Sequence, residues 1–145
     1  MIKTQYLNIR DQWVQDLIWK HVVPEDIHEG YTKLDAINFI TDQIYDGKQV
    51  LIGNDEVILR CVLVNKHVVE PHILGNGIYI RQTIEEAIAF ARDNSEMQRI
   101  VVWTHYKAIG RILKGCGFEL SATLEKYYLN SSGLHDLLGY TREIK

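Results

Sequence analysis

Apolar residues recur along the chain at two spacings, and the changes between these spacings divide it into strands and helices. Residues 3–9 alternate enough to predict a short strand. Apolar residues then recur at helical spacing over residues 13–22, which predicts a helix that stops at Pro24. A second helix is predicted between Thr32 and Gly47, because a Thr-x-x-Asp capping box opens an apolar stripe that the glycine closes.

The middle of the chain is rich in β-branched residues. The runs between residues 49 and 73 are interrupted by turn-forming residues at 54–55 and 65–66, so we expect three strands joined as a meander. Residues 80–91 place their apolar side chains on one helical face and predict the next helix. The apolar run 99–104 has the length and composition of a strand in the buried centre of a mixed sheet.

The last third of the chain predicts one more helix and a closing hairpin. This helix is expected to carry four apolar residues at helical spacing, Ala108, Ile109, Ile112 and Leu113. Residues 118–130 and 134–144 flank a turn at 131–133 and predict two antiparallel strands. Together the elements predict an α/β fold with a mixed, mostly antiparallel sheet of about seven strands and four helices.

Length and composition predict a single domain over residues 1–145. The mass of 16.8 kDa is that of one ordinary domain. No segment approaches the ~20 apolar residues of a membrane helix, so we expect no membrane partner. The N terminus lacks the apolar core and small-residue cleavage site of a secretory signal, which favours a protein of the cytoplasm or of a virion.

Charge and metal-ligating residues narrow the choice of partners. A net charge of −3 and no local Lys/Arg cluster argue against a nucleic-acid partner. An anionic cofactor would then depend on oriented backbone amides. The six histidines and two cysteines have no zinc-site or disulfide spacing, so we expect no metal and two reduced, partly buried thiols, Cys61 and Cys116.

A glycine pair precedes the predicted helix over residues 80–91. Glycines at this position let the backbone approach a ligand, while the N–H groups of a helix N terminus point outward. The predicted pyrophosphate cradle consists of five residues, His72, Gly75, Asn76, Gly77 and Ile78. A turn that needs positive φ would place glycines there as well, so this pair alone leaves both interpretations open.

The run from His72 to Gly77, His-x-x-Gly-x-Gly, resembles the phosphate-binding motif of the GNAT superfamily of acyl-CoA-dependent N-acetyltransferases, in which Gln or Arg stands at position 72. The predicted element order, β-α-α-β-β-β-α-β-α-β-β, is also that of this superfamily. Residues 117–143 are similar to the closing pattern of ribosomal-protein-type and phage-encoded GNAT proteins. The matching positions are Gly117, Phe118, Leu124, Lys126, Tyr128, Gly133, Asp136, Tyr140, Thr141, Arg142 and Glu143. Up to about residue 65 the similarity is only topological.

The resemblance implies a GNAT fold and acetyl-CoA as cosubstrate, bound where the fourth and fifth strands separate. The acceptor amine would attack directly, which requires a base for the ammonium and an acid for the leaving thiolate. Glu70 and His72 lie two residues apart on the predicted fourth strand, so they share a face and are the candidates for the base. The alternatives are that His72 closes a turn and that Glu70 faces solvent.

The candidate for the acid departs from the family pattern. Many GNAT proteins carry a tyrosine where this chain has Leu113, and Tyr128, Tyr127 and Tyr106 are the candidate substitutes. Each of these tyrosines could equally be a packing residue. The asparagine that the family carries near the start of its fourth helix is absent as well, with His105 and Tyr106 in that neighbourhood.

Two functions therefore remain open from the sequence. The first is an acetyl-CoA-dependent N-acetyltransferase that acts on an amine of a small molecule or a protein. The second is a catalytically inactive GNAT-fold phage protein that acts in virion head assembly, with phage structural proteins as partners, or as an interaction module. The departures at His72 and Leu113 favour the second, and the element order and glycine pair favour the first.

Overall fold

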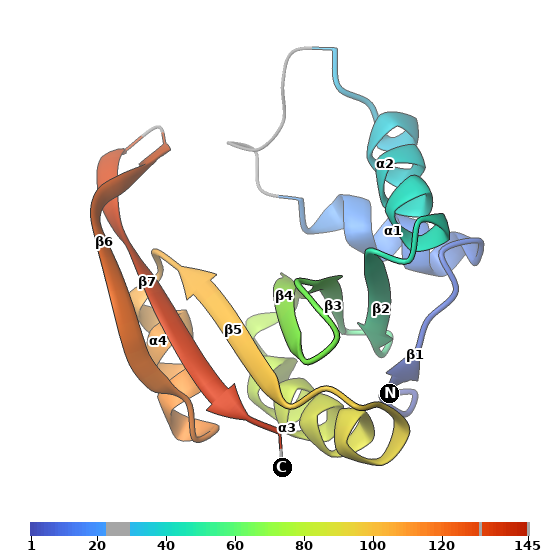
Figure 1. Ribbon diagram of the computed structural model, residues 1–145. Helices are drawn as coiled ribbons and strands as arrows, with labels where there is room; N and C mark the ends of the chain where they lie inside the picture. The colour runs from blue at the N-terminus through green and yellow to red at the C-terminus, as the bar shows by residue number, and fades with distance from the viewer. Residues whose placement is uncertain (23–29, 131, 145) are drawn as a thin grey trace.

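The computed structural model describes residues 1–22, 30–130 and 132–144, and its centre is one seven-stranded sheet in the order β1-β2-β3-β4-β5-β7-β6 (Figure 1). Neighbouring strands are antiparallel except β4 and β5, which are parallel. The strands are β1 (Gln5–Tyr6), β2 (Gln49–Gly53), β3 (Val57–Leu63), β4 (Val68–Gly75), β5 (Arg99–Thr104), β6 (Glu119–Asn130) and β7 (Gly133–Glu143). The helices are α1 (Gln12–Lys20), α2 (Lys33–Tyr45), α3 (Gly77–Asn94) and α4 (Lys107–Gly115).

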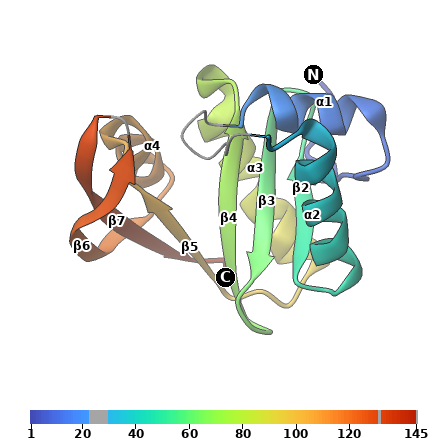
Figure 2. The same cartoon turned by 90° about the horizontal axis from the view of Figure 1, so that it is seen from above.

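Helices cover both faces of the sheet. Figure 2 shows α1 and α2 on one face and α3 on the other. Successive strand residues point to opposite faces. Leu51 and Ile58 therefore pack under α1 and α2, whereas their neighbours Ile52 and Leu59 pack under α3 and α4. The sheet thus has an apolar core on each side, as the β-branched runs of β2 and β3 lead one to expect.

The N-terminal segment differs from its prediction. Strand β1 has 2 residues instead of the stretch predicted over 3–9. The side chain of Asn8 accepts a hydrogen bond from the N–H of Arg10 (2.9 Å), and this local turn directs the chain away from the sheet edge. Helix α1 ends at Lys20. The predicted stop at Pro24 lies outside the described residues.

The second helix and the meander agree with their predictions. The capping box is present: the N–H of Asp35 donates to Thr32 Oγ1 (3.2 Å) and the N–H of Thr32 donates to Asp35 Oδ2 (2.9 Å). Strands β2, β3 and β4 are consecutive antiparallel neighbours. In the first turn, Asn54 Oδ1 accepts from the N–H groups of Glu56 (2.8 Å) and Val57 (3.0 Å), which holds the hairpin.

The inward face of α4 differs from the predicted one. Leu113 is fully buried and Ile109 partly buried, but Ala108 is exposed. Gly110 is buried instead, against the ring of Tyr140 from β7. A Cβ at Gly110 would lie 2.4 Å from Tyr140 Oη, so only glycine leaves room for that ring. This contact between distant parts of the chain decides which side of α4 faces the core.

Residues of the C-terminal pattern hold the closing hairpin in place. Gly117 has φ +85°, in the left-handed region that favours glycine, and Phe118 after it is 4% exposed. Arg142 of β7 donates from Nη1 to the carbonyl oxygen of Cys116 (2.8 Å), which joins β7 to the end of α4. These positions therefore have structural roles.

Candidate active site

A cleft opens where β4 and β5 separate. The two strands pair only at Val68 with Arg99 and Val69 with Ile100, and both continue beyond these pairs. The space beyond is a cleft of about 800 Å³ whose walls come mainly from β4, β5 and the β6–β7 hairpin. Parallel neighbours that diverge in this way leave room for a ligand between two strands of one sheet.

Glu70 and His72 face this cleft from the same side of β4. Glu70 Oε1 lies 3.9 Å from His72 Nε2, and the two side chains are 29% and 52% exposed. Both are therefore accessible to water and to a small amine. His72 itself stands within β4, paired with Arg60 of β3.

The two glycines of the predicted cradle have different surroundings. Gly75 ends β4 with φ +154°, and a Cβ there would lie 2.5 Å from the carbonyl oxygen of Glu56. Packing against β3 therefore requires this glycine. Gly77 begins α3, and a Cβ there would meet nothing within 4 Å. Of the pair, Gly77 is the residue whose backbone is open to a ligand.

Asn76 uses part of the hydrogen-bonding capacity at the start of α3. Its side chain accepts from the N–H of Ile78 (3.2 Å), and its carbonyl oxygen accepts from the N–H of Tyr79 (3.0 Å). The N–H of Gly77 has no acceptor in the described part of the chain. Asn76 therefore acts as the N-cap of α3, and the N–H of Ile78 is already hydrogen-bonded to it.

The opposite wall of the cleft contains Tyr128, which is held by stacking. Its ring lies 4.3 Å from that of His105, with 16° between the planes. A bulge in β6 places both Tyr127 and Tyr128 along the cleft, although successive strand residues normally point apart. Lys126 in this bulge has φ 47°, and its N–H donates to Asp136 Oδ1 (3.0 Å). The structure thus brings Tyr128 into one cleft with the two predicted base candidates.

The position of the missing family tyrosine faces the core in this chain. Leu113 is 0% exposed and packs under the sheet, away from the cleft. Tyr106 lines the cleft at the start of α4, where its N–H donates to Thr104 Oγ1 (3.0 Å), and it is 47% exposed. Tyr127 is 67% exposed, whereas Tyr128 is partly buried. Tyr128 is therefore the least exposed of the three substitute tyrosines.

Sequence reasoning overlooked two polar residues of the cleft. His21 follows α1 and reaches the cleft wall, and Arg60 reaches it from β3. Burial, followed by the nearby charge of Lys20, lowers the pKa of His21, while Glu56 acts in the opposite direction. A neutral imidazole at this place can accept a proton. No local pattern marks either residue, because the fold alone brings them to the cleft.

Thiol and metal chemistry have little support among the described residues. Cys61 and Cys116 are both free and buried. Burial raises the pKa of Cys61 to about 12 and also raises that of Cys116, so both thiols stay protonated near neutral pH.

In the described ranges, no group of three or more His, Cys, Asp or Glu side chains could hold a metal ion. The described helices include none that is long and apolar enough to cross a membrane.

The fold is shared with solved N-acetyltransferases. A chimera of the spermidine N-acetyltransferase SpeG from Vibrio cholerae and hSSAT superposes with a TM-score of 0.79 at 12% identity, covering 98% of this chain and 95% of that chain. The Vibrio cholerae enzyme in complex with CoA and spermine has a TM-score of 0.76 at 12% identity, with 97% and 94% covered. A dodecameric structure of the same enzyme also has a TM-score of 0.76 at 12% identity, with 98% and 93% covered.

At this identity the likeness establishes the fold and not the reaction. It confirms the predicted mixed sheet of seven strands with four helices in the described residues. The structural neighbours are GNAT-superfamily enzymes, and none of these similarities supports the expected relation to phage head-assembly proteins. No protein-family model matches the sequence, and no curated protein matches it significantly.

Proposed function

We propose that this chain is an N-acyltransferase that transfers an acetyl group from acetyl-CoA to an amine of a small molecule or a protein. The observation that carries the proposal is the cleft between β4 and β5, in which Glu70, His72 and Tyr128 share one space beside the N terminus of α3. The fold likeness to acetyltransferases, one of them bound to CoA and spermine, supports the same chemistry.

The N terminus of α3 suits the phosphates of the cosubstrate. An exposed helix N terminus favours an anion through its partial positive charge and its N–H groups. The N–H of Gly77 has no acceptor in the described chain. No atom lies within 4 Å of the place where a Cβ of residue 77 would be, so a phosphate can approach this backbone. The overall charge of −3 supplies no attraction, so this local geometry would have to provide it.

The transfer itself requires two proton movements, for which the cleft has groups. The amine nitrogen bonds to the thioester carbonyl carbon, the C–S bond breaks, and the sulfur leaves as a thiolate. Glu70 or His72 would take one proton from the ammonium, directly or through one water, so that the neutral amine can attack. The Tyr128 hydroxyl would give a proton to the leaving thiolate, and the second proton that the nitrogen loses as the amide forms would replace it. Backbone N–H donors would stabilise the oxygen that becomes negative as the amine attacks.

Leu113 favours a second candidate function. A chain that lost the family's acid at this position could keep the fold and serve as an interaction module without turnover. Such a protein would bind CoA weakly or not at all, or bind it without releasing a free thiol. The two functions therefore differ in measurable ways.

Cosubstrate binding is tested by thermal unfolding with acetyl-CoA. At a concentration about 100 times Kd, binding adds about 2.7 kcal/mol to the free energy of unfolding. For a chain of this length that corresponds to a rise in Tm of roughly 8 °C. Gly77→Val should unfold near the wild-type temperature without ligand, because nothing lies within 4 Å of its Cβ, yet should lose most of the rise. No rise in the wild-type protein would contradict the proposal.

Turnover is tested by the release of free CoA thiol over a panel of amines that includes spermine, spermidine, lysine-containing peptides and simple monoamines. Glu70→Gln and His72→Gln separate the two base candidates, since only loss of the true base should lower kcat by roughly 100-fold or more. Tyr128→Phe should lower kcat with little change in KM, because the ring still stacks on His105. Binding of acetyl-CoA without thiol release for any amine would favour the interaction module.

A further inference from the structure

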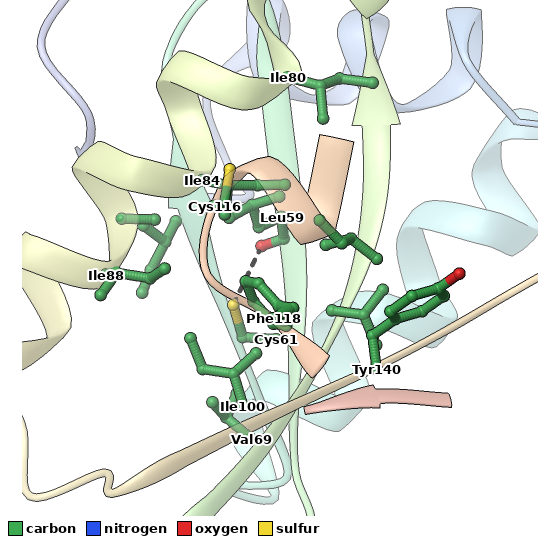
Figure 3. Close-up of a cluster of buried hydrophobic side chains, with 14 of the residues drawn as sticks. Leu59, Cys61, Val69, Ile80, Ile84, Ile88, Ile100, Cys116, Phe118 and Tyr140 are labelled. Atoms are coloured by element: carbon green, nitrogen blue, oxygen red, sulfur yellow. Dashed lines mark hydrogen bonds between the residues drawn. The ribbon is translucent and has the colours of Figure 1, made fainter. Parts of the chain in front are cut away.

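A second cavity lies under α3, on the face of the sheet opposite to Glu70 and His72. Its volume is about 160 Å³, and its lining comes from α3, the sheet and Phe118. Figure 3 shows several of these lining residues in one buried cluster, with Cys61, Val69 and Ile100 from the sheet and Ile88 from α3. A space of this size is comparable to engineered apolar cavities of about 150 Å³ that stay dry and bind benzene.

The polar atoms in the lining already have partners or carry no charge. The Ser95 hydroxyl donates to the carbonyl oxygen of Ala91 (2.7 Å). The Cys61 thiol points to the carbonyl oxygen of Leu59 (3.6 Å) and stays protonated, because burial raises its pKa to about 12. The half-exposed Tyr6 adds one hydroxyl, and the other lining side chains are apolar, so the cavity suits a hydrocarbon group.

The cavity adjoins the cleft at the point where β4 and β5 separate. Pro71, Ile73 and Val102 line both spaces. Pro71 and Ile73 alternate along β4 with the cleft residues Glu70 and His72, so the same short segment faces the cavity with one side and the cleft with the other. The cleft and the cavity therefore share part of a wall, so an acyl chain that extended from the cleft across this wall would move from polar into apolar surroundings.

We propose that this cavity takes the hydrocarbon tail of an acyl-CoA longer than acetyl-CoA, with about four to six carbons beyond the thioester carbonyl. The inference rests on the proposed function, because it places the thioester in the cleft. The bond changes are unchanged: the amine nitrogen bonds to the carbonyl carbon, the C–S bond breaks, and CoA leaves with one proton. The tail takes no part in these steps, so its effect falls on binding of the acyl donor.

The experiment compares the Kd values of CoA, acetyl-CoA and hexanoyl-CoA by titration calorimetry. Burial of each additional carbon strengthens binding about fourfold at most, so the four extra carbons of the hexanoyl group set an upper limit of about 200-fold. We expect hexanoyl-CoA to bind at least about tenfold more tightly than acetyl-CoA. Thiol release with hexanoyl-CoA and an accepted amine should show the same preference in kcat/KM.

Filling the cavity provides the structural control. Ala87 lines the cavity from α3 and is 7% exposed, whereas Ala89 on the same helix is exposed and outside it. Ala87→Leu should remove the preference for hexanoyl-CoA and leave the Kd of acetyl-CoA unchanged, and Ala89→Leu should change neither. If Ala87→Leu does not fold, Ala91→Leu fills the same space from the next turn of α3.

The outcomes separate the two proposals. Equal affinity for acetyl-CoA and hexanoyl-CoA would overturn the cavity proposal alone, as would a preference that survives in the filled variants. Failure of all three CoA compounds to bind would overturn the proposed function and the cavity proposal together. Tighter binding of hexanoyl-CoA that Ala87→Leu abolishes and Ala89→Leu preserves would establish the cavity as the acyl site.

Discussion

Gly75 and Gly77 stand two residues apart, and we predict opposite responses to the same substitution by alanine. At Gly75 a Cβ would lie 2.5 Å from the carbonyl oxygen of Glu56 and 2.7 Å from Val57 Cα. Both obstacles are backbone atoms of the chain that leads into β3, so they cannot rotate away as a side chain would. At Gly77 a Cβ would meet nothing within 4 Å.

The cost of Gly75→Ala has two sources. The φ of +154° belongs to a region that glycine alone adopts readily, and forcing another residue into it costs about 1–3 kcal/mol. Overlap in a packed region adds about 1–3 kcal/mol, since the backbone has to shift. The sum of roughly 2–6 kcal/mol corresponds to a fall in Tm of roughly 6–18 °C for a chain of this length. Gly77→Ala should leave stability unchanged or raise it by about 0.4–1 kcal/mol, because alanine restricts the unfolded chain.

Thermal unfolding followed by circular dichroism, together with urea unfolding, measures both variants without ligand. A Gly75→Ala protein as stable as the wild type would refute the argument that packing against β3 requires this glycine. An equal loss in Gly77→Ala would refute it as well, because the two positions would then share a structural role. The pair also serves as the fold control for the cosubstrate experiment with Gly77→Val.

Two further outcomes test other parts of the structure. Asn54 is fully buried and donates from Nδ2 to Thr4 Oγ1 (3.1 Å) and Thr83 Oγ1 (3.0 Å). Asn54→Ala should therefore lower the free energy of unfolding, measured by urea titration, by about 2–4 kcal/mol. A change below about 1 kcal/mol would contradict this structural role. The folded-state pKa of His21 is lowered by burial and by Lys20, so the unfolded chain binds the proton more readily. The stability that neutral His21 contributes is thus present above its unfolded pKa of about 6.5 and lost as the pH falls below it, and Tm measured from pH 8 to pH 5 should fall less in His21→Gln than in the wild type. Parallel curves for the two proteins would contradict the shift.

The amino-acid sequence by itself determined the order and type of the main elements. Helical spacing, alternation and the capping box at Thr32 are local properties, and local backbone geometry follows from them directly. The shared face of Glu70 and His72 was also predictable, because residues two positions apart on a strand point to the same face of the sheet.

Only the tertiary structure decided the features that depend on contacts between distant segments. Tyr140 packs against Gly110 and so determines which face of α4 is buried. The chain before β3 packs against Gly75, whereas no atom lies within 4 Å of a Cβ at Gly77. The bulge in β6 brings Tyr128 beside His105. The separation of β4 from β5, which creates the cleft, is likewise not marked by any local sequence pattern. Contacts between residues that are distant in the sequence depend on how whole helices and strands pack. The spacing of residues along the chain does not predict that packing.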